Sequence, residues 1–379
     1  MRSQFKVALG VLLTAMVGLA LPVTAAHADA GAQHGKAAPA VFAQTNDPGG
    51  NAVLVYSRAG DGTLTAAATF PTGGAGATQP GAVVDPLASQ GSVVYDRDHN
   101  LLFTVNAGSG SISTFSVSGL QLTLRQVIPS RGEFPTSLTV HGDLLYALNA
   151  GGDGAVAGFR IAARRLHAIN NSVRTLHLGN ANPPFFLDTP GQVGFTPDGR
   201  DLIVTTKSHG TIDVFPVRPN GRLGAIVVNP SASEVPFAFD FDASGRLAVS
   251  SAGASALTTY SIAASGLLTV ESGPVPDTQQ AGCWIVGVPG NFFYIGNTAS
   301  ASLSTFQVVN GAVSLQTAAT PTSGGPIDLA VPSHGEFLYS ENGGAGTIDE
   351  FSVSANGALT PIGRITGLAA HVIEGIAAS

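Results

Sequence analysis

Side chains that could do chemistry recur at one place in this sequence, just before a series of short apolar segments. The set holds carboxylates, amides, a guanidinium and an imidazole: Gln79, Asp85, Arg131, Glu133, Asp188, Glu234, Gln279, Gln280, Asp328, His371 and Glu374. If the fold gathers them at one opening, a carboxylate or the imidazole could activate a water while the arginine stabilises a developing oxyanion. The interpretation that we favour is a hydrated, ligand-binding rim of an acidic pore, because no spacing among these residues is diagnostic of catalysis.

Other chemistries have weaker support in the sequence. The chain lacks His-x-x-x-His, His-Glu-x-x-His and Cys-x-x-Cys, so we expect no dedicated transition-metal site, although a Ca²⁺ ion in a channel stays an alternative. The single cysteine, Cys283, adjoins the single tryptophan, Trp284, in an apolar run, which predicts a buried and inert thiol. No cofactor is expected, because the chain has no paired axial ligands and little else to hold a quinone or a haem.

The elements that position the candidate residues are internal repeats. Residues 101–117 read LLFTVNAGSGSISTFSV, and close copies occupy residues 292–308 and 337–353. Looser copies begin at Val41, Leu144, Leu202 and Leu247. Seven copies at a typical spacing of about 45 residues, all built of strand-like segments, predict an all-β, seven-bladed β-propeller with four strands in each blade.

Each repeat carries an aromatic residue at one position and an aliphatic residue three positions earlier. The aromatic residues are Tyr56, Phe115, Phe159, Phe215, Tyr260, Phe306 and Phe351. Positions i and i+3 of a strand point to opposite faces, so we expect both faces of every sheet to be buried between neighbouring blades. Five of the seven preceding segments end in Asn, which we interpret as a turn residue that tolerates positive φ.

The last segment of each repeat is short and apolar, as in residues 92–96 (SVVYD) and 237–241 (FAFDF). We expect these segments to be the innermost strands. The first repeat begins without such a segment, while the chain ends with a spare one at residues 372–378. The C-terminal strand should therefore complete the N-terminal blade and close the ring, which removes an exposed sheet edge.

Two connections that lead into inner strands are longer than the others, at residues 72–91 and 170–191. In a propeller such connections lie on one face, together with the candidate residues, and long loops on a rigid scaffold commonly carry function. The second connection contains Phe185, Phe186 and Leu187, which are apolar enough to form a lid over a central pocket or to contact a protein partner.

The N-terminus predicts export. Arg2 and Lys6 precede an apolar run at residues 7–21 and Ala-x-Ala steps at residues 26–30, a pattern typical of a secretory signal peptide; a retained anchor is the alternative. We therefore divide the chain into a signal peptide (1–30), a flexible segment (31–40) and the propeller (41–379), and expect it to be secreted or extracytoplasmic.

Charge and hydropathy exclude several partners. The formal net charge is −7 and no Lys/Arg cluster occurs, so the electrostatic footprint of a nucleic-acid-binding protein is absent. No later stretch approaches the roughly 20 apolar residues that a membrane-spanning helix needs. We expect a monomer that takes a small-molecule ligand.

Two stretches resemble known propeller families. Residues 101–117 resemble the YVTN-type repeat of surface and secreted proteins. Residues 191–223, GQVGFTPDGRDLIVTTKSHGTIDVFPVRPNGRL, resemble the lactonase family of seven-bladed propellers, which includes 6-phosphogluconolactonases and fungal carboxymuconate cyclases. Active members often have Pro-His at the start of an inner strand and an Asp-Leu-Gly turn, where this chain has Pro190-Gly191 and Thr206-Lys207-Ser208.

The resemblance implies that the protein hydrolyses or binds a small lactone or a sugar-derived ligand at the channel mouth. Glu234 and His371 best match an acid/base pair of the family type, and in the catalytic version one of them activates water while Arg131 stabilises the oxyanion. We expect the ligand-binding residues to be Glu133, Asp188, Gln279 and Glu374. The alternative is a non-catalytic extracellular binding propeller that has the fold without the chemistry.

Overall fold

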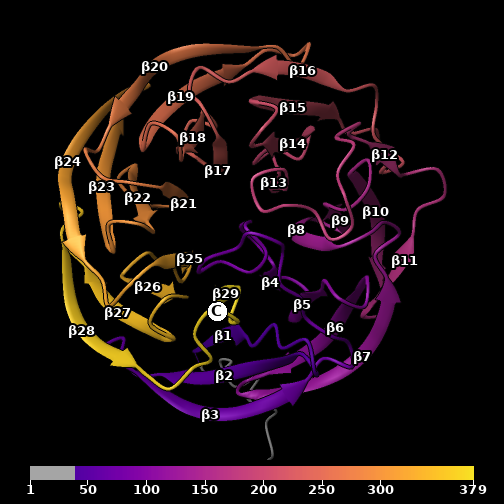
Figure 1. The fold of residues 1–379 in the computed structure, drawn as a ribbon, viewed down its shortest axis with the longest axis horizontal. Helices are drawn as coiled ribbons and strands as arrows, with labels where there is room; N and C mark the ends of the chain where they lie inside the picture. Colours follow the sequence, from indigo (N-terminus) through magenta and orange to yellow (C-terminus); the bar gives the residue numbers. More distant parts are fainter. Residues whose placement is uncertain (1–38) are drawn as a thin grey trace, which may run out of the picture. The chain divides into compact units, whose positions relative to one another are not determined.

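The computed structural model describes residues 39–379, so the predicted signal peptide lies outside the described residues. The described chain forms seven antiparallel sheets arranged in a ring (Figure 1). Short runs rich in Val, Ile, Leu, Phe and Thr, separated by Gly-containing turns, favour this series of strands. The predicted all-β, seven-bladed β-propeller is confirmed.

The strands of each blade are given from the ring axis outward. Blade 1 has β29 (Ile376–Ala378), β1 (Ala40–Gln44), β2 (Ala52–Arg58) and β3 (Leu64–Pro71); blade 2 has β4 (Val93–Asp96), β5 (Leu101–Asn106), β6 (Ser111–Ser118) and β7 (Gln121–Pro129). Blade 3 has β8 (Pro135–His141), β9 (Leu144–Asn149), β10 (Ala155–Ala162) and β11 (Arg165–Ala168), with β12 (Arg174–Thr175) paired to β10 beside β11. Blade 4 has β13 (Pro190–Phe195), β14 (Asp201–Thr206), β15 (Thr211–Pro216) and β16 (Val227–Pro230).

Blade 5 has β17 (Pro236–Phe241), β18 (Leu247–Ser251), β19 (Ala256–Ile262) and β20 (Leu268–Pro276). Blade 6 has β21 (Gly282–Val288), β22 (Phe292–Asn297), β23 (Ser302–Val309) and β24 (Ala312–Pro321). Blade 7 has β25 (Pro326–Ala330), β26 (Phe337–Asn342), β27 (Thr347–Val353) and β28 (Leu359–Ile365). The short apolar segments are thus the innermost strands, as predicted.

The core lies between the blades. All seven predicted aromatic residues are buried, and the aliphatic residues three positions earlier are fully buried: Val53, Ile112, Val156, Ile212, Leu257, Leu303 and Ile348. Because these two sets of side chains point to opposite faces, each blade packs against both of its neighbours. The predicted two-faced burial is confirmed.

The C-terminal strand closes the ring. β29 pairs with β1 in an antiparallel ladder that places Val41 opposite Ala378 and Ala43 opposite Ile376. The backbone N–H of Ser379 extends the pairing to the carbonyl of Ala40 at 2.9 Å. Figure 1 shows the C-terminus beside β1, at the inner edge of blade 1. The predicted closure is confirmed.

Candidate functional site

The first long connection, which links β3 to β4, crosses the centre of the ring. The hydroxyl of Ser89 donates to the carbonyl of Thr136 in blade 3 at 2.9 Å. The backbone N–H of Gln90 donates to the carbonyl of Gly191 in blade 4 at 2.9 Å, and its side-chain amide exchanges two 2.9 Å hydrogen bonds with the backbone of Ile285 in blade 6. One segment that bonds inner strands of blades 3, 4 and 6 must lie across the axis (Figure 1). We call residues 85–91 the plug.

The first long connection lies on the predicted face of the propeller. The sequence did not predict that this connection also fills the channel. Residues 85–89 are all buried, although they belong to a loop without regular strands. The apolar residues that follow Asp85, namely Pro86, Leu87 and Ala88, are the signal that could have indicated a buried path. A loop can be buried only when its backbone groups find partners, and the inner strands supply them.

Four buried carboxyl groups meet near the plug. Asp85 belongs to the plug, Asp328 to β25 and Glu341 to β26, while Glu374 lies two residues before β29. Asp328 Oδ2 accepts the backbone N–H of Ile376 at 3.3 Å, and Glu341 Oε2 accepts that of Gly375 at 2.7 Å. The structure therefore buries Asp85, Asp328 and Glu374, which the sequence analysis placed at the hydrated rim.

Burial governs how these carboxyl groups titrate. Removal from water, followed by the charge of Asp85, raises the pKa of Glu374 well above its usual range. Removal from water also raises the pKa of Asp328 to about 8, and with the charge of Asp328 it raises the pKa of Glu341 well above its usual range. Buried titratable groups with perturbed pKa values, gathered at one place in a fold, are typical of functional sites.

Lys207 is the cationic member of this cluster. Its Nζ donates to the carbonyl of Ala88 in the plug at 2.6 Å and lies 4.9 Å from the centre of the Phe237 ring. Burial lowers the pKa of Lys207 to about 8, while the nearby Asp85 opposes that shift. From the sequence, Lys207 was noticeable only because it stands where the resembling family has an Asp-Leu-Gly turn, and no motif around it indicates a buried lysine.

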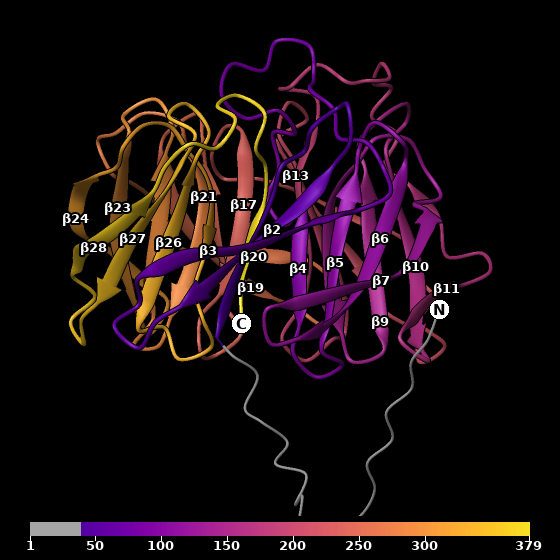
Figure 2. The same cartoon turned by 90° about the horizontal axis from the view of Figure 1, so that it is seen from below.

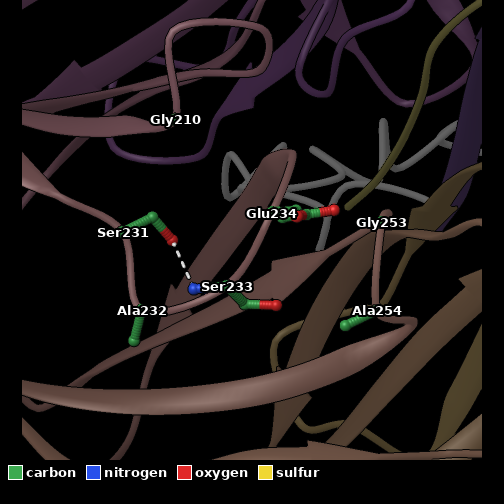
Figure 3. Close-up of a pocket in the computed structure, with 7 residues that line it drawn as sticks. All are labelled: Gly210, Ser231, Ala232, Ser233, Glu234, Gly253 and Ala254. Atoms are coloured by element: carbon green, nitrogen blue, oxygen red, sulfur yellow. Dashed lines mark hydrogen bonds between the residues drawn. The ribbon is translucent and has the colours of Figure 1, made fainter.

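Glu234 lies in a hollow of its own. The hollow has a volume of about 420 Å³ and is lined by Gly210, Ser231, Ala232, Ser233, Glu234, Gly253 and Ala254, from blades 4 and 5 (Figure 3). Gly253 is needed beside Glu234, because a Cβ atom there would lie 2.9 Å from both the Cβ and the carbonyl oxygen of Glu234. A carboxylate and two serines can together hydrogen-bond a polar ligand.

His371 lies within the connection between β28 and β29, five residues before β29, and is exposed. Its Nδ1 lies 2.8 Å from the carbonyl oxygen of Val83, just before the plug. A carbonyl can only accept, so Nδ1 carries the proton and the neutral ring has an unprotonated Nε2. No residue in the described range 39–379 makes a hydrogen bond to Nε2, which leaves it able to accept a proton from water.

The other predicted residues are spread over the same face. Arg131 is exposed, and Glu133 lines a separate hollow of about 380 Å³ beside Asn182 of the second long connection. Asp188 is half-buried in that connection. Gln279 is half-buried and accepts a 3.4 Å hydrogen bond from Ser302.

The structure does not gather the predicted catalytic residues. Arg131, Glu234 and His371 precede the inner strands of blades 3, 5 and 1, and the hollow that Glu234 lines includes neither of the other two. No hydrogen bond or ion pair joins any two of them within residues 39–379. Of the residues with a predicted catalytic or ligand-binding role, Glu374 alone lies in the buried cluster, together with the rim candidates Asp85 and Asp328. The catalytic and ligand-binding roles stay predictions.

The second long connection packs on the first. The backbone N–H of Phe186 donates to the carbonyl of Pro80 at 3.1 Å, and the Phe185 ring covers Gly81, where a Cβ atom would lie 2.2 Å from it. Phe185 and Leu187 are 43% and 42% exposed. Figure 2 shows long loops rising from the same face. A contact of this loop with a protein partner stays a prediction.

The described chain gives no support for a metal site or for a membrane-spanning helix. Within residues 39–379, no three His, Cys, Asp or Glu side chains are placed to hold a metal ion. The same residues contain no helix of the length and apolar character that crossing a membrane requires.

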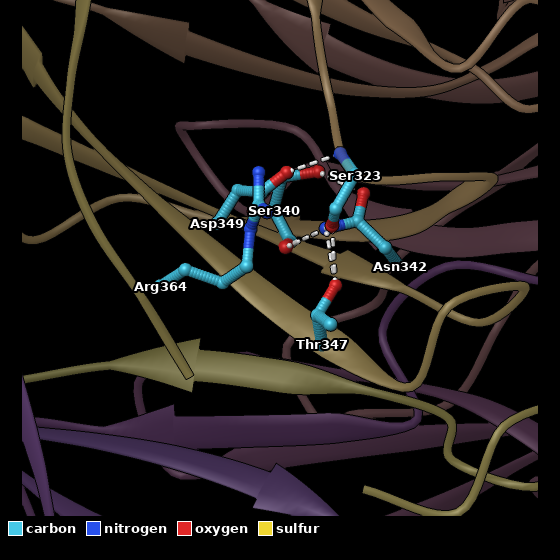
Figure 4. A network of polar contacts seen from close by, with 6 residues as sticks. All are labelled: Ser323, Ser340, Asn342, Thr347, Asp349 and Arg364. Atoms are coloured by element: carbon cyan, nitrogen blue, oxygen red, sulfur yellow. Dashed lines mark hydrogen bonds and ion pairs between the residues drawn. The ribbon is translucent and has the colours of Figure 1, made fainter. Parts of the chain in front are cut away.

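The backbone conformation of the Asn residues at the strand ends differs from the prediction of positive φ. Only Asn46 has a positive φ, of 46°. Asn106, Asn297 and Asn342 remain in their strands, where their amides bind hydroxyl groups of the following turn and strand. Asn342 Nδ2 donates to the hydroxyl groups of Thr347 and Ser323, each at 3.2 Å. Figure 4 shows this network of polar contacts. These hydrogen bonds join the ends of the strands to the turns that follow them and stabilise the blades.

Asn106→Ala should lower the free energy of unfolding by about 2–4 kcal/mol, because it orphans buried polar partners. The Asn106 amide binds Asn51 and Thr72 through Oδ1, and Ser111 and Ser113 through Nδ2. Urea denaturation measures the change. Asn149→Ala is the matched control, since its Oδ1 has no partner among the described residues and its Nδ2 makes only long bonds of 3.4 and 3.5 Å. Equal losses in the two variants would contradict this assignment.

Comparison with known proteins agrees with the fold. Residues 50–175 match a family described as lactonase, 7-bladed β-propeller. Candidate 6-phosphogluconolactonases from Bacteroides uniformis and Bacteroides fragilis each give a TM-score of 0.69, at 17% and 18% identity, over 90% of this chain and 100% and 98% of theirs. A periplasmic gluconolactonase from Pseudomonas aeruginosa gives 0.66 at 17% identity, over 90% of this chain and 98% of that one. No curated sequence matches. The described chain is thus a seven-bladed β-propeller, as its repeats predict, and its residues 50–175 are similar to that lactonase family.

Proposed function

We propose that the protein is an exported lactonase that binds and hydrolyses a small lactone, with a sugar-derived aldonolactone as the preferred class. The main observation behind the proposal is the placement of His371, an exposed residue whose Nε2 has no hydrogen-bond partner in residues 39–379. Its Nδ1 binds the carbonyl of Val83, two residues before Asp85 of the buried cluster. The structural relatives named above include a periplasmic gluconolactonase, which supports both the substrate class and the export.

In the proposed reaction His371 Nε2 takes a proton from a water as the water oxygen attacks the lactone carbonyl. The C–O bond of the ring then breaks, and the imidazolium returns its proton to the leaving ring oxygen, which gives a hydroxy acid. The carbonyl of Val83 holds the ring in the required tautomer. Arg131 is proposed to stabilise the oxyanion. Glu133, Asp188, Gln279 and Glu374 are proposed to bind or orient the substrate, and Glu234 is the alternative base in its own hollow.

Variants of the two candidate bases locate the reaction. His371→Ala should lower kcat on an aldonolactone by about 10²–10⁴-fold, because general-base catalysis contributes in this range. Glu234→Gln should leave kcat within about threefold if His371 is the base. His334→Ala, which removes an exposed histidine from the β25–β26 turn, is the matched control and should have no effect. Wild-type kcat in His371→Ala with a stable fold would contradict the role of His371.

A non-catalytic binding propeller is the second candidate. It is favoured by two observations: the plug fills the channel, and Arg131, Glu234 and His371 make no contact with one another in the described residues. Titration calorimetry separates the two candidates. Heat of binding without release of acid would favour the binding propeller, and turnover above the spontaneous rate would exclude it.

A further inference from the structure

We propose that the plug is a proton-operated lock: one proton shared by Asp85 and Glu374 holds it in the channel, and loss of that proton releases it. The inference concerns the state of the channel and does not depend on any lactone chemistry. Its basis is the position of the plug, the lack of donors to its carboxyl group and the charges around it.

The plug is docked by hydrogen bonds from several blades, so its release is a discrete event. Ser89, Gln90 and Gly91 bond to inner strands, and Lys207 holds the carbonyl of Ala88. The indole Nε1 of Trp284 donates to the carbonyl of Ser89 at 3.0 Å. The partners of the plug lie on different blades. Partial withdrawal of the plug would therefore break several of these hydrogen bonds together.

Asp85 is the residue of the plug whose carboxyl group is only partly hydrogen-bonded. Its Oδ1 accepts the backbone N–H groups of Leu87 at 3.1 Å and Ala88 at 2.6 Å, which shapes the turn inside the plug. Its Oδ2 is buried and receives no donor from residues 39–379, and the same holds for both carboxyl oxygens of Glu374. Two neighbouring carboxyl groups with unfilled oxygens repel each other when both are ionised, whereas one shared proton supplies the missing donor.

The groups that face this pair come from every element around it. Lys207 approaches from blade 4, Asp328 and Glu341 from blade 7, Cys283 from blade 6, and Asp188 of the second long connection lies near Lys207. Burial raises the pKa of the Cys283 thiol, so it stays uncharged. With one proton on the pair and one on Lys207, the Asp85–Glu374–Lys207 group is neutral, which suits a buried site.

The sign of the pH effect follows from burial. In the docked plug burial raises the pKa of both Asp85 and Glu374, whereas a released plug exposes Asp85 to water and restores its ordinary value. The docked state therefore holds more protons, and rising pH favours release. Burial lowers the pKa of Lys207 to about 8 in the docked state. The titration of Lys207 therefore favours the docked state as the pH rises. Burial raises the pKa values of Asp328 and Glu341 as it does those of Asp85 and Glu374. Four carboxyl groups therefore favour release at high pH, and their combined effect outweighs that of one lysine.

The chain contains its own reporter for this release, since Trp284 is the only tryptophan and it bonds to the plug. On raising the pH from about 6 to about 10, we expect Trp284 emission to shift to longer wavelength and its quenching by acrylamide to rise about twofold, reversibly. The β-sheet signal in far-UV circular dichroism should not change over this range. Loss of that signal together with the Trp284 shift would indicate global unfolding and would overturn the lock.

Glu374→Gln separates the lock from other titrations. A glutamine amide donates to Asp85 at every pH, so the variant should keep Trp284 protected to pH 10. Glu336→Gln, at an exposed site, is the control and should titrate like the wild type. If Glu374→Gln does not fold, Asp85→Asn serves, because its Oδ1 keeps the acceptor for Leu87 and Ala88. A wild-type transition in whichever variant folds, or no Trp284 change in the wild type, would overturn the proposal.

Discussion

Removal of residues 376–379 is expected to lower the free energy of unfolding by roughly 5–8 kcal/mol, comparable to the whole stability of many domains. The deletion takes away β29, the innermost strand of blade 1, together with its ladder to β1 and the burial of Ile376. It also removes the Ile376 N–H that Asp328 accepts, which leaves a buried carboxyl oxygen without that donor. The shortened chain should therefore be largely unfolded at 37 °C.

Circular dichroism and urea denaturation of the shortened chain measure this effect. A chain that lacks Ser379 alone is the matched control, because it keeps the β1–β29 ladder and loses only the bonds that Ser379 makes, including those to Ala40. The free energy of unfolding of this control should fall by about 1–2 kcal/mol. If the four-residue deletion unfolds at the wild-type urea concentration, closure by the C-terminal strand does not stabilise the ring.

Gly191→His would introduce the Pro-His pair of the lactonases that residues 191–223 resemble, and we expect it to lower the free energy of unfolding by at least about 3 kcal/mol. A Cβ atom on Gly191 would lie 2.0 Å from the carbonyl oxygen of Phe237, the backbone of the neighbouring blade. Backbone cannot rotate away as a flexible side chain can, so blades 4 and 5 would have to separate. The departure from the family pair thus has a structural cause in this chain.

Thermal and urea denaturation check the Gly191→His prediction. Gly60→His is the matched control: no atom lies within 4 Å of a Cβ built there, and Gly60 is exposed. That variant should stay within about 0.5 kcal/mol of the wild type. Equal stability of the two variants would mean that blades 4 and 5 tolerate a side chain between them.

The fold was predictable because each blade repeats the same local rules. The aromatic residue and the aliphatic residue three positions earlier, such as Phe159 and Val156, predict two buried faces in every repeat, and the spare C-terminal segment predicts closure. The Asn residues were misinterpreted because residue type alone does not reveal φ. Asn106 is equally compatible with a turn and with a strand whose hydroxyl partners lie five and seven residues later.

The candidate site was less predictable, because it depends on the path of loops. Periodicity places Arg131, Glu234 and His371 on one face, but it does not measure their separation around the ring. Burial of Asp85 and Glu374 follows from the plug crossing the axis, which depends on partners such as Thr136 and Ile285 that are distant in sequence. Lys207 enters the cluster in the same way, and no local pattern distinguishes it from a surface lysine.

Hydrolysis of a small lactone by this propeller can be measured directly. Purified protein, lacking residues 1–30, is added to a panel of aldono- and muconolactones, and acid release is followed in a pH-stat. The account predicts turnover of at least one aldonolactone well above the spontaneous rate, with His371→Ala reduced at least about 100-fold. Release at the spontaneous rate on every lactone would contradict the claim and leave a binding propeller.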